Sequence, residues 1–358
     1  MIKIEIDPVW RFHKEDHSES ITITLGFLNE IRATGKITSA AQAAQLSYRH
    51  AWNLIEKWSA FFDAPLVERH QGKGSALTPF GEKLVWAGQR LQARLKPQLE
   101  NLSQELQTEL MQFLPHGSSM LRIHASHGFA VAHLRELFNS EPDIGLDLRY
   151  VSNQNSLVSL TRGECDLAGM HLPRGSLRKR SVAAVKGVLS PDLHRVVSFV
   201  KREMGLMVKR GNPQRIDSLQ RLLDPAVRFV NRDPDSGTRL LFEQLLAQHR
   251  LDGNRINGYT QIEFTHSAVA SYVASNMADV AFGVEAAARQ FDLDFVPLVT
   301  EDYFFVCLKQ LIDTEPMKRL QAIMRSKAFH VAVSALPGYT LESPGEIKTL
   351  TSMFRKPG

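Results

Sequence analysis

The stretch from Ser39 to Thr78 constrains the fold of this chain more than any other. It runs from a helix of small residues, AAQAA, through a tight turn to a polar-tipped helix, and it ends in a basic glycine loop, HQGKG. Small side chains let two helices approach closely, and the glycine loop lies between two short extended runs. This order of parts is typical of a winged helix-turn-helix, in which the second helix enters the major groove of DNA. The sequence therefore predicts a DNA-binding unit.

The expected second helix has one apolar and one polar face. Its apolar positions recur at helical spacing and are Ala51, Leu54, Ile55, Trp58 and Phe62. Ser47 is a candidate N-cap for this helix, and Thr38 or Ser39 for the preceding one. Arg and Asn side chains can read base edges, whereas Tyr and Lys suit phosphates. We expect the DNA contacts at Ser39, Gln42, Ser47, Tyr48, Arg49, His50, Asn53, Lys57 and Lys73. The alternative is an exposed charged helix beside a solvated loop.

Composition limits the rest of the chain. Its 358 residues allow two or three hydrophobic cores, and the formal net charge of +5 permits a polyanionic partner. Two cysteines are too few for a disulfide framework or a multi-cysteine zinc site. The first residues lack the apolar core of a signal peptide, and no run reaches the roughly 20 apolar residues that span a bilayer. We therefore expect a cytoplasmic protein without a membrane partner.

A long helical pattern follows Pro79. Its leucines recur every three or four residues, at Leu91, Leu95, Leu99, Leu102, Leu106 and Leu110. A stripe this narrow needs a partner, and a second copy of the same helix is the simplest one. We expect a dimer helix over residues 81–112, which would place two recognition helices on a pseudo-palindromic site, and a kink or interruption at Pro97. The alternative is that the leucines pack against the chain's own second domain.

From Met120 onward, strands alternate with helices. Residues 121–125, 145–151 and 166–172 read as strands separated by helices, which predicts a parallel sheet. The pattern repeats after residue 208, and crossings near 200–208 and 299–306 would join two lobes. The expected organisation is α/β overall: a winged helix-turn-helix over residues 1–80, the linker helix over 81–112, and a two-lobed effector domain over 119–358.

Small polar residues cluster where these strands end and the next helices begin. In parallel sheets ligands bind at such places, and the N–H groups at a helix start favour anions. The alternative for each Ser or Thr is simple helix capping. We expect ligand contacts at Ser126, His127, Asn153, Asn155, Ser156, His171, Ser236, Gly237, Thr238, Arg239, Thr265, His266, Ser267, Val269 and Tyr303.

Two resemblances bear on these expectations. The runs SAAQAAQLSYRHAWNLIEKW and PLVERHQGKGSALTPFGEKLV resemble the molybdate-responsive regulators of the ModE family and, more distantly, the LysR-type regulators. The resemblance covers roughly residues 20–95. It implies that Ser47, Tyr48, Arg49 and Asn53 lie on the recognition helix and Lys73 on the wing. Nothing after residue 110 resembles the β-barrel repeats that bind molybdate in ModE.

The second resemblance covers about residues 119–330. The turn SGTR and the runs THSAVASYVASNMADVAFG and GLMVKRGNP resemble periplasmic-binding-protein-like domains, and more narrowly their molybdate- and tungstate-binding members. It implies two lobes that close on a small ligand.

Other readings have less support. His124 and His127 are a candidate metal pair, but no cysteine or carboxylate cluster accompanies them. No G-x-S-x-G, P-loop or G-x-G-x-x-G motif opens a helix, so we expect no enzyme and no cofactor. The basic run over residues 171–215 is either a solvated face or a contact with DNA or a neighbouring subunit.

Together these patterns predict a homodimeric or homotetrameric transcriptional regulator that binds double-stranded DNA. Its expected effector is a small oxyanion, with molybdate or tungstate first. The alternatives are a regulator that senses an organic carboxylate or a pterin-type ligand, and an enzyme with a regulatory DNA-binding domain.

Overall fold

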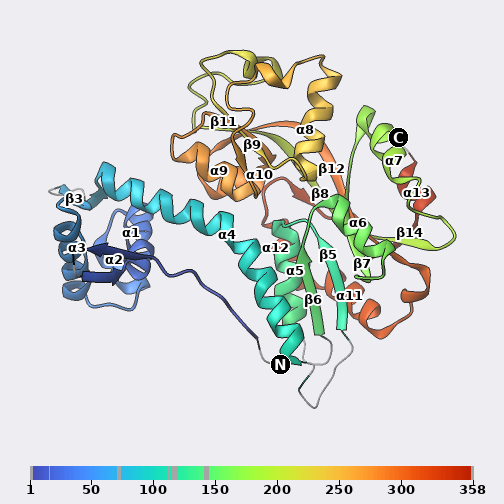
Figure 1. The fold of residues 1–358 in the computed structure, drawn as a ribbon, viewed down its shortest axis with the longest axis horizontal. Coiled ribbons are helices and arrows are strands. Elements are labelled where there is room, and N and C mark those ends of the chain that lie inside the picture. The colour runs from blue at the N-terminus through green and yellow to red at the C-terminus, as the bar shows by residue number, and fades with distance from the viewer. Residues whose placement is uncertain are drawn as a thin grey trace. The chain divides into compact units, whose positions relative to one another are not determined.

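The computed structural model describes residues 3–15, 17–70, 74–111, 113, 120–140 and 145–355. The chain forms two compact units, Asp7–Ala93 and Met1–Ile6 together with Arg94–Gly358 (Figure 1). Within the described ranges, no helix combines the length and the apolar character that crossing a bilayer requires. Lys73, a predicted DNA contact, lies outside the described residues.

The smaller unit is the predicted winged helix-turn-helix. Its elements are β1 (Arg11–Lys14), β2 (His17–Ser20), α1 (Thr22–Thr34), α2 (Ile37–Ala43), α3 (Tyr48–Phe62), β3 (Val67–His70) and β4 (Gly74–Leu77). Strands β3 and β4 pair antiparallel and form the wing. The amide of Ser75 donates to the carbonyl of Gly35 at 2.8 Å, which ties the wing to the turn after α1. A Cβ on Gly74 would lie 2.5 Å from that carbonyl oxygen, so this approach requires glycine.

One helix start differs from the prediction. Lys36, not Thr38 or Ser39, is the N-cap residue of α2, and it makes no side-chain cap bond. Thr38 and Ser39 lie inside the first turn, so the predicted caps were wrong. The prediction for α3 is confirmed, because the Ser47 hydroxyl accepts from the amide of His50 at 3.2 Å.

The core of this unit draws on a hairpin that the sequence patterns did not indicate. Ala51, Ile55 and Trp58 of α3 are buried, as predicted, whereas Leu54 and Phe62 are half-buried. The hairpin of β1 and β2 adds the ring of Phe12, whose centroid lies 6.1 Å from that of Trp58 and 5.1 Å from that of Phe62. The segment before α1 therefore covers one end of the helical core.

The long helix α4 (Pro79–Met111) continues through Pro97, so the proline does not interrupt it. A polar face of α4 packs on the larger unit: the Asn101 amide group donates to the carbonyl of Tyr150 at 2.8 Å and accepts from its N–H at 2.7 Å. The leucine face points elsewhere, because Leu102, Leu106 and Leu110 are 51%, 44% and 56% exposed. Leu91, Leu95 and Leu99 are half-buried, so among the described residues only the last three leucines of the stripe are exposed rather than packed on the chain's own core.

The larger unit is built on a ten-stranded mixed sheet in the order β10-β9-β11-β8-β12-β7-β5-β6, with β13 and β14 also paired to β8. The strands are β5 (Met120–Ala125), β6 (Gly145–Tyr150), β7 (Leu167–Pro173), β8 (His194–Val208), β9 (Phe229–Arg232), β10 (Ile262–Glu263), β11 (Val280–Val284), β12 (Asp294–Leu308), β13 (Tyr339–Thr340) and β14 (Ile347–Thr349).

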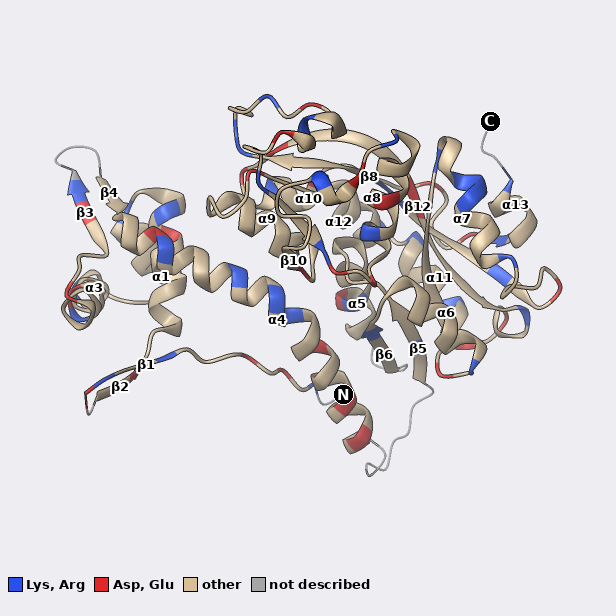
Figure 2. Ribbon diagram, turned by 45° about the horizontal axis from the view of Figure 1, so that its top comes forward, with Lys and Arg blue, Asp and Glu red and all other residues tan. Residues whose placement is uncertain are grey.

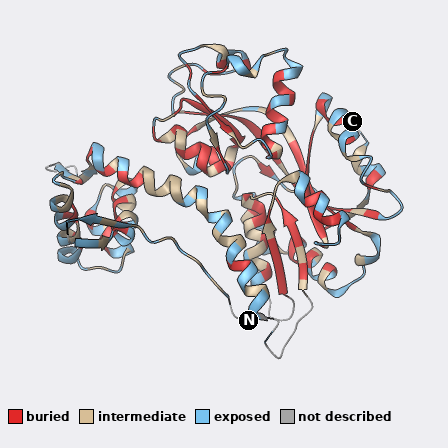
Figure 3. Ribbon diagram, viewed as in Figure 1, coloured by how far each residue is buried: buried red, intermediate tan, exposed pale blue. Residues whose placement is uncertain are grey.

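Helices cover this sheet. The α-helices are α5 (Phe129–Asn139), α6 (Asn153–Thr161), α7 (Arg178–Val185), α8 (Gly237–Gln248), α9 (His266–Ala274), α10 (Glu285–Gln290), α11 (Glu315–Arg325), α12 (Lys327–Ser334) and α13 (Leu350–Phe354). Short 3-10 helices are η1 (Gly175–Leu177), η2 (Leu219–Leu223), η3 (Gly253–Arg255) and η4 (Lys309–Leu311). The central strands are buried, whereas the outer faces of the helices are exposed (Figure 3).

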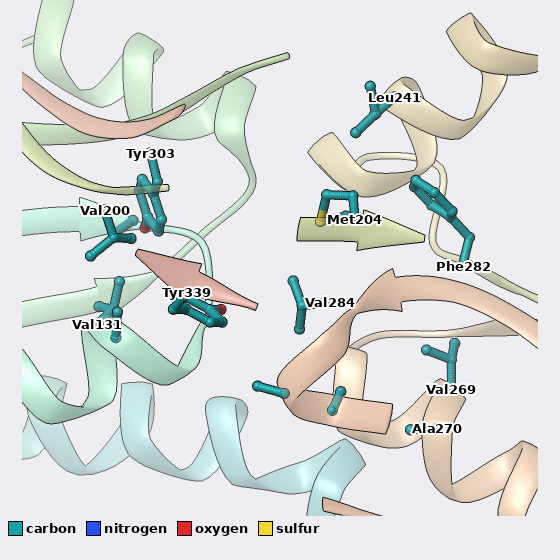
Figure 4. Packing of buried hydrophobic residues seen from close by; sticks show 14 of the residues in the cluster. Val131, Val200, Met204, Leu241, Val269, Ala270, Phe282, Val284, Tyr303 and Tyr339 are labelled. Carbon is teal, nitrogen blue, oxygen red and sulfur yellow. The ribbon is translucent and has the colours of Figure 1, made fainter. Parts of the chain in front are cut away.

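Two long antiparallel strands divide the sheet into two lobes. Strand β8 pairs with β11 through Met204–Val208, and β12 pairs with β7 through Glu301–Cys307. Strands β5, β6 and β7 are parallel in one lobe, and β9, β10 and β11 are parallel in the other. The buried core occupies both lobes: Tyr303 and Tyr339 lie in one part, and Leu241 and Phe282 in another (Figure 4).

Candidate functional site

A cavity of about 220 Å³ opens where the carboxyl ends of strands in both lobes meet. It brings together these predicted residues: Ser126, His127, His171, Ser236, Gly237, Thr238, Thr265 and His266. Arg94, Pro97 and Gln98 of α4 also line it.

Helix starts surround this cavity. Ser236 and Thr265 are the N-cap residues of α8 and α9, and their hydroxyls accept from the amides of Arg239 at 3.1 Å and Ala268 at 2.9 Å. These two hydroxyls therefore cap their helices, which was the alternative to ligand binding for each Ser or Thr. The first N–H groups of each helix still have no partner within the helix, and they carry its positive dipole end. The cavity is thus suited to an anion.

Arg232 is the most informative residue in the cavity, and it was not among the predicted ligand residues. Its Nη2 donates to the carbonyl of Phe264 at 2.9 Å and lies 3.8 Å from the carboxylate of Asp233. Its Nε and Nη1 are buried and have no hydrogen-bond partner among the described residues. Burial lowers the pKa of Arg232 to about 10. Arg232 is the last residue of β9, and its place at the carboxyl end of a strand was the available signal.

Arg202 of β8 is a second missed cation in the lining. Its side chain is 3% exposed, and its Nε and Nη2 donate to the Glu301 carboxylate at 3.0 and 2.8 Å. Burial opposes its charge, but Glu301 outweighs that effect and the pKa of Arg202 is raised. No local motif distinguishes this arginine, because it lies within a buried strand.

Three histidines face these two arginines across the cavity. Burial, together with nearby cations, lowers the pKa of His127 to about 3. Burial and the charges of Arg202 and Arg232 also hold the pKa values of His171 and His266 well below 6.5. Both ring nitrogens of His171 and the Nδ1 of His266 are buried without a hydrogen-bond partner among the described residues. At neutral pH the three rings are therefore uncharged, and those of His171 and His266 have unused hydrogen-bonding capacity.

Several predicted ligand residues lie outside this cavity. Tyr303 is buried, and its hydroxyl donates to the carbonyl of Ser126 at 3.2 Å. Arg239 donates to Glu243 at 2.7 Å and lies over the ring of Tyr259. Neither side chain lines the cavity.

The other predicted residues have local roles. Ser156 donates to the carbonyl of Ser152 at 3.1 Å, Ser267 donates to Gln290 at 2.9 Å, and Val269 belongs to the core. Asn155 is exposed, and Asn153 lines a neighbouring cavity.

The N-terminal unit presents the predicted polar face. Tyr48, Arg49, His50, Asn53 and Lys57 of α3 are exposed, and so are Gln42 and the Ser47 cap, whereas Ser39 is half-buried. Lys57 forms an ion pair with Glu19 at 2.7 Å.

Arg69 of the wing was not predicted but meets this face. Its Nη2 donates to the Tyr48 hydroxyl at 2.6 Å, and its guanidinium carbon lies 3.9 Å from the centre of the Trp52 ring. Figure 2 shows basic and acidic residues adjoining along β3. The basic side chain joins α3 and the wing into one surface.

Comparisons with known proteins agree with this division. Residues 134–325, more than half of the chain, match the model of the PBP superfamily domain. The chain belongs to the PBP superfamily. Residues 24–82 match the bacterial regulatory helix-turn-helix proteins of the lysR family. The chain therefore combines a helix-turn-helix of the lysR family with a PBP superfamily domain that follows it.

Individual relatives match parts of the chain. The uncharacterized protein YvgK of Bacillus subtilis is 31% identical over 199 residues, which are 56% of this chain and 64% of that protein. The transcriptional regulator ModE of Haemophilus influenzae is 39% identical over 62 residues, 16% of this chain and 24% of that protein. The chain thus spans less than two thirds of either relative. A hydrogen-peroxide-bound OxyR mutant of Corynebacterium glutamicum superposes with a TM-score of 0.46 at 14% identity, covering 87% of this chain and 94% of that one.

Proposed function

We propose that the chain binds operator DNA through α3 and the wing and senses a small oxyanion through its PBP superfamily domain. The observation that carries the proposal is the Arg232 guanidinium, a cation with two buried nitrogen atoms that lack partners among the described residues. A buried charge without good pairing is costly, and a bound anion would offset that cost. Neutral histidines and the starts of α8 and α9 supply further donors.

The size of the cavity favours a small ligand. About 220 Å³ is less than the roughly 300–1,000 Å³ of pockets that take drug-sized molecules. Molybdate and tungstate are the first candidates, because both halves of the sequence resemble proteins that handle these anions. A relative in Azotobacter vinelandii, named molybdenum transport protein ModE, is 34% identical over 83 residues, 31% of that protein.

The exposed leucine face of α4 supports a homodimer, or a homotetramer built from it. Leu102, Leu106 and Leu110 share one helix face and are each more than two-fifths exposed. Pairing two copies through this face would remove apolar surface from water. It would also present two α3 helices to a pseudo-palindromic operator.

The ligand would act on α4 directly. Arg94 of α4 lines the cavity, with its Nε 3.7 Å from the Glu263 carboxylate and its guanidinium 5.3 Å from the centre of the Phe264 ring. An oxyanion beside Arg232 would compete with Glu263 for Arg94. A switch requires that the ligand prefer one arrangement of α4, since equal affinity for both shifts nothing.

Thermal unfolding tests the oxyanion site. Molybdate, tungstate, sulfate, phosphate and formate are added in turn to the wild type, to Arg232→Gln and to Arg210→Gln. A ligand at about 100 times its Kd should stabilise the wild type by roughly 2.7 kcal/mol. We expect R232Q to lose this gain.

Arg210 is the matched control, because it is 74% exposed, pairs with Asp292 and does not line the cavity. R210Q should keep the response. The absence of stabilisation by every oxyanion, or an equal response in R232Q, would contradict the oxyanion proposal and leave the DNA-binding proposal to its own test.

A further inference from the structure

A second cavity of about 340 Å³ lies between α6, β7, α7 and α8. Its walls are mainly apolar, with Leu157, Met170, Leu172 and Leu241 among them. Glu301 also lines it, but this buried carboxylate is already paired with Arg202 at 2.8 Å. Among its described lining residues no cation is present, so this compartment is suited to an uncharged apolar group.

The two cavities adjoin at His171 and Gly237, which line both. Both ring nitrogens of His171 and the Oδ1 of Asn153 are buried at this junction without hydrogen-bond partners among the described residues. A Cβ on Gly237 would lie 3.5 Å from the Cβ of Asn153 and 3.8 Å from the Nδ1 of His171. Because Gly237 has no side chain, a narrow space is left between the two cavities, and a methyl group would fill it.

We propose that the two cavities form one bipartite site for an organic oxyanion. The acid group would lie beside Arg232, and an uncharged aromatic or aliphatic body would extend past Gly237 into the apolar compartment. Polar atoms at the start of that body would meet Asn153 and His171. The inference rests on the proposed function for its charged end, and it puts an organic acid in place of an inorganic anion as the preferred ligand, because the second cavity adds room for an apolar body.

The apolar compartment is bounded by both lobes. Ser181 of α7 donates to Gln244 of α8 at 3.1 Å, and Ser176 of η1 donates to Gln248 at 3.2 Å. Val158 and Leu240, from α6 and α8, are 42% and 43% exposed beside it. A ligand body between them would contact both lobes and favour their closure, and an inorganic anion in the first cavity would lack these contacts.

Isothermal titration with methylphosphonate and phenylphosphonate tests the inference. Burying an aromatic ring gains on the order of tenfold or more in affinity, so phenylphosphonate should bind the wild type at least about tenfold more tightly than methylphosphonate. Gly237→Ala fills the passage at ordinary van der Waals distances and should reduce this ratio toward one. Val158→Glu places a charge in the apolar compartment and should reduce the ratio while methylphosphonate still binds.

Val331→Glu is the matched control, because Val331 is 62% exposed on α12 and lines neither cavity. It should leave the ratio unchanged. Equal affinities of the two phosphonates for the wild type, or a ratio that survives both G237A and V158E, would overturn the bipartite site. Stabilisation by inorganic oxyanions would then still support the proposed function, whereas no binding of any oxyanion would contradict both.

Discussion

At the scale of residues, burial and charge together set the chemistry of the anion cavity. Arg202 keeps its charge because Glu301 pairs with it, whereas Arg232 has only a carboxylate at 3.8 Å and a carbonyl. The histidines around them stay neutral because burial and these two cations oppose protonation. The positive charge of the two arginines is therefore only partly balanced by carboxylates. A bound anion would favour protonation of the histidines.

The pH dependence of stability follows from these histidines. His127, His171 and His266 have pKa values lowered in the folded state, so the unfolded chain binds more protons below about pH 6.5. The stability that their neutral forms contribute is present above that pH and is lost as the pH falls toward about 3 for His127. We expect the free energy of unfolding to fall between pH 7.5 and 5.5, and sulfate to reduce the loss because an anion raises histidine pKa values.

Denaturant unfolding at several pH values, with and without sulfate, measures this effect. The range from pH 7.5 to 5.5 lies above the ordinary pKa values of carboxyl groups. Burial raises the pKa values of Asp233 and Glu301, and their protonation would increase the free energy of unfolding as the pH falls, opposite to the effect of the histidines. The exposed His249 serves as a control, since His249→Gln should not alter the profile. A sulfate effect that is the same at pH 7.5 and 5.5 would show that the histidines do not face the anion.

At the scale of elements, α3 and α4 each have one face that packs against the fold and another that is exposed. Helix α3 buries Trp58 in the core and presents Arg49 and Asn53 to solvent. Within the larger unit, helix α4 bonds to β6 through Asn101 and leaves Leu102, Leu106 and Leu110 exposed. In both helices the 3.6-residue period separates the packed face from the exposed face.

Replacing the exposed polar residues of α3 should weaken operator binding. Arg49→Ala and Asn53→Ala each remove a candidate base contact, and we expect each to cost roughly 1–3 kcal/mol of specific affinity. Fluorescence anisotropy with operator and unrelated DNA measures this. Arg210→Ala removes the same charge from the larger unit and should bind like the wild type. Unchanged specificity in both α3 variants would place the recognition surface elsewhere.

A charge in the leucine face of α4 should prevent self-association. Leu106→Glu places two carboxylates together in the proposed homodimer, so we expect monomers in sedimentation velocity at concentrations where the wild type is dimeric. The side chain is 44% exposed in the isolated chain, so the fold should tolerate the change. Val331→Glu, on another exposed apolar residue, should stay dimeric. A dimeric L106E protein would exclude this face as the interface.

At the scale of the whole molecule, α4 is the element common to the two units. It begins at Pro79 in the smaller unit and runs to Met111 in the larger unit. Its residues Arg94, Pro97 and Gln98 belong to the larger unit and line the cavity. In the proposed function, this continuous helix would link ligand binding to DNA binding.

Arg94→Gln should separate ligand binding from the DNA response. Allosteric coupling is typically about 5–150-fold in affinity, and we expect oxyanion to change the operator affinity of the wild type by at least about fivefold. R94Q should still be stabilised by oxyanion but should show little change in operator affinity. Lys96→Gln, at an exposed position of α4 outside the cavity lining, should respond like the wild type. A full response in R94Q would exclude this route.

Local patterns in the sequence were sufficient for much of the architecture. The apolar period of α3, its Ser47 cap and the paired strands of the wing each depend on residues close in the chain, so they could be recognised from it alone. The alternation of strands and helices after Met120 is local in the same sense. It also placed Ser236 and Thr265 correctly at helix starts. The cap of α2 was misplaced because Thr and Ser are common both at N-caps and within a first turn.

The charges of the ligand site were decided only by the tertiary structure. Arg202 lies in β8, Glu301 in β12 and Arg232 at the end of β9, and no spacing in the sequence links them. The antiparallel pairing of β8 with β12 sets Arg202 opposite Glu301. The strand order then brings Arg232 to the same cavity as His171. A sequence pattern reports what a residue's neighbours in the chain favour, whereas the unsatisfied charge of Arg232 depends on residues that only the folded sheet brings together.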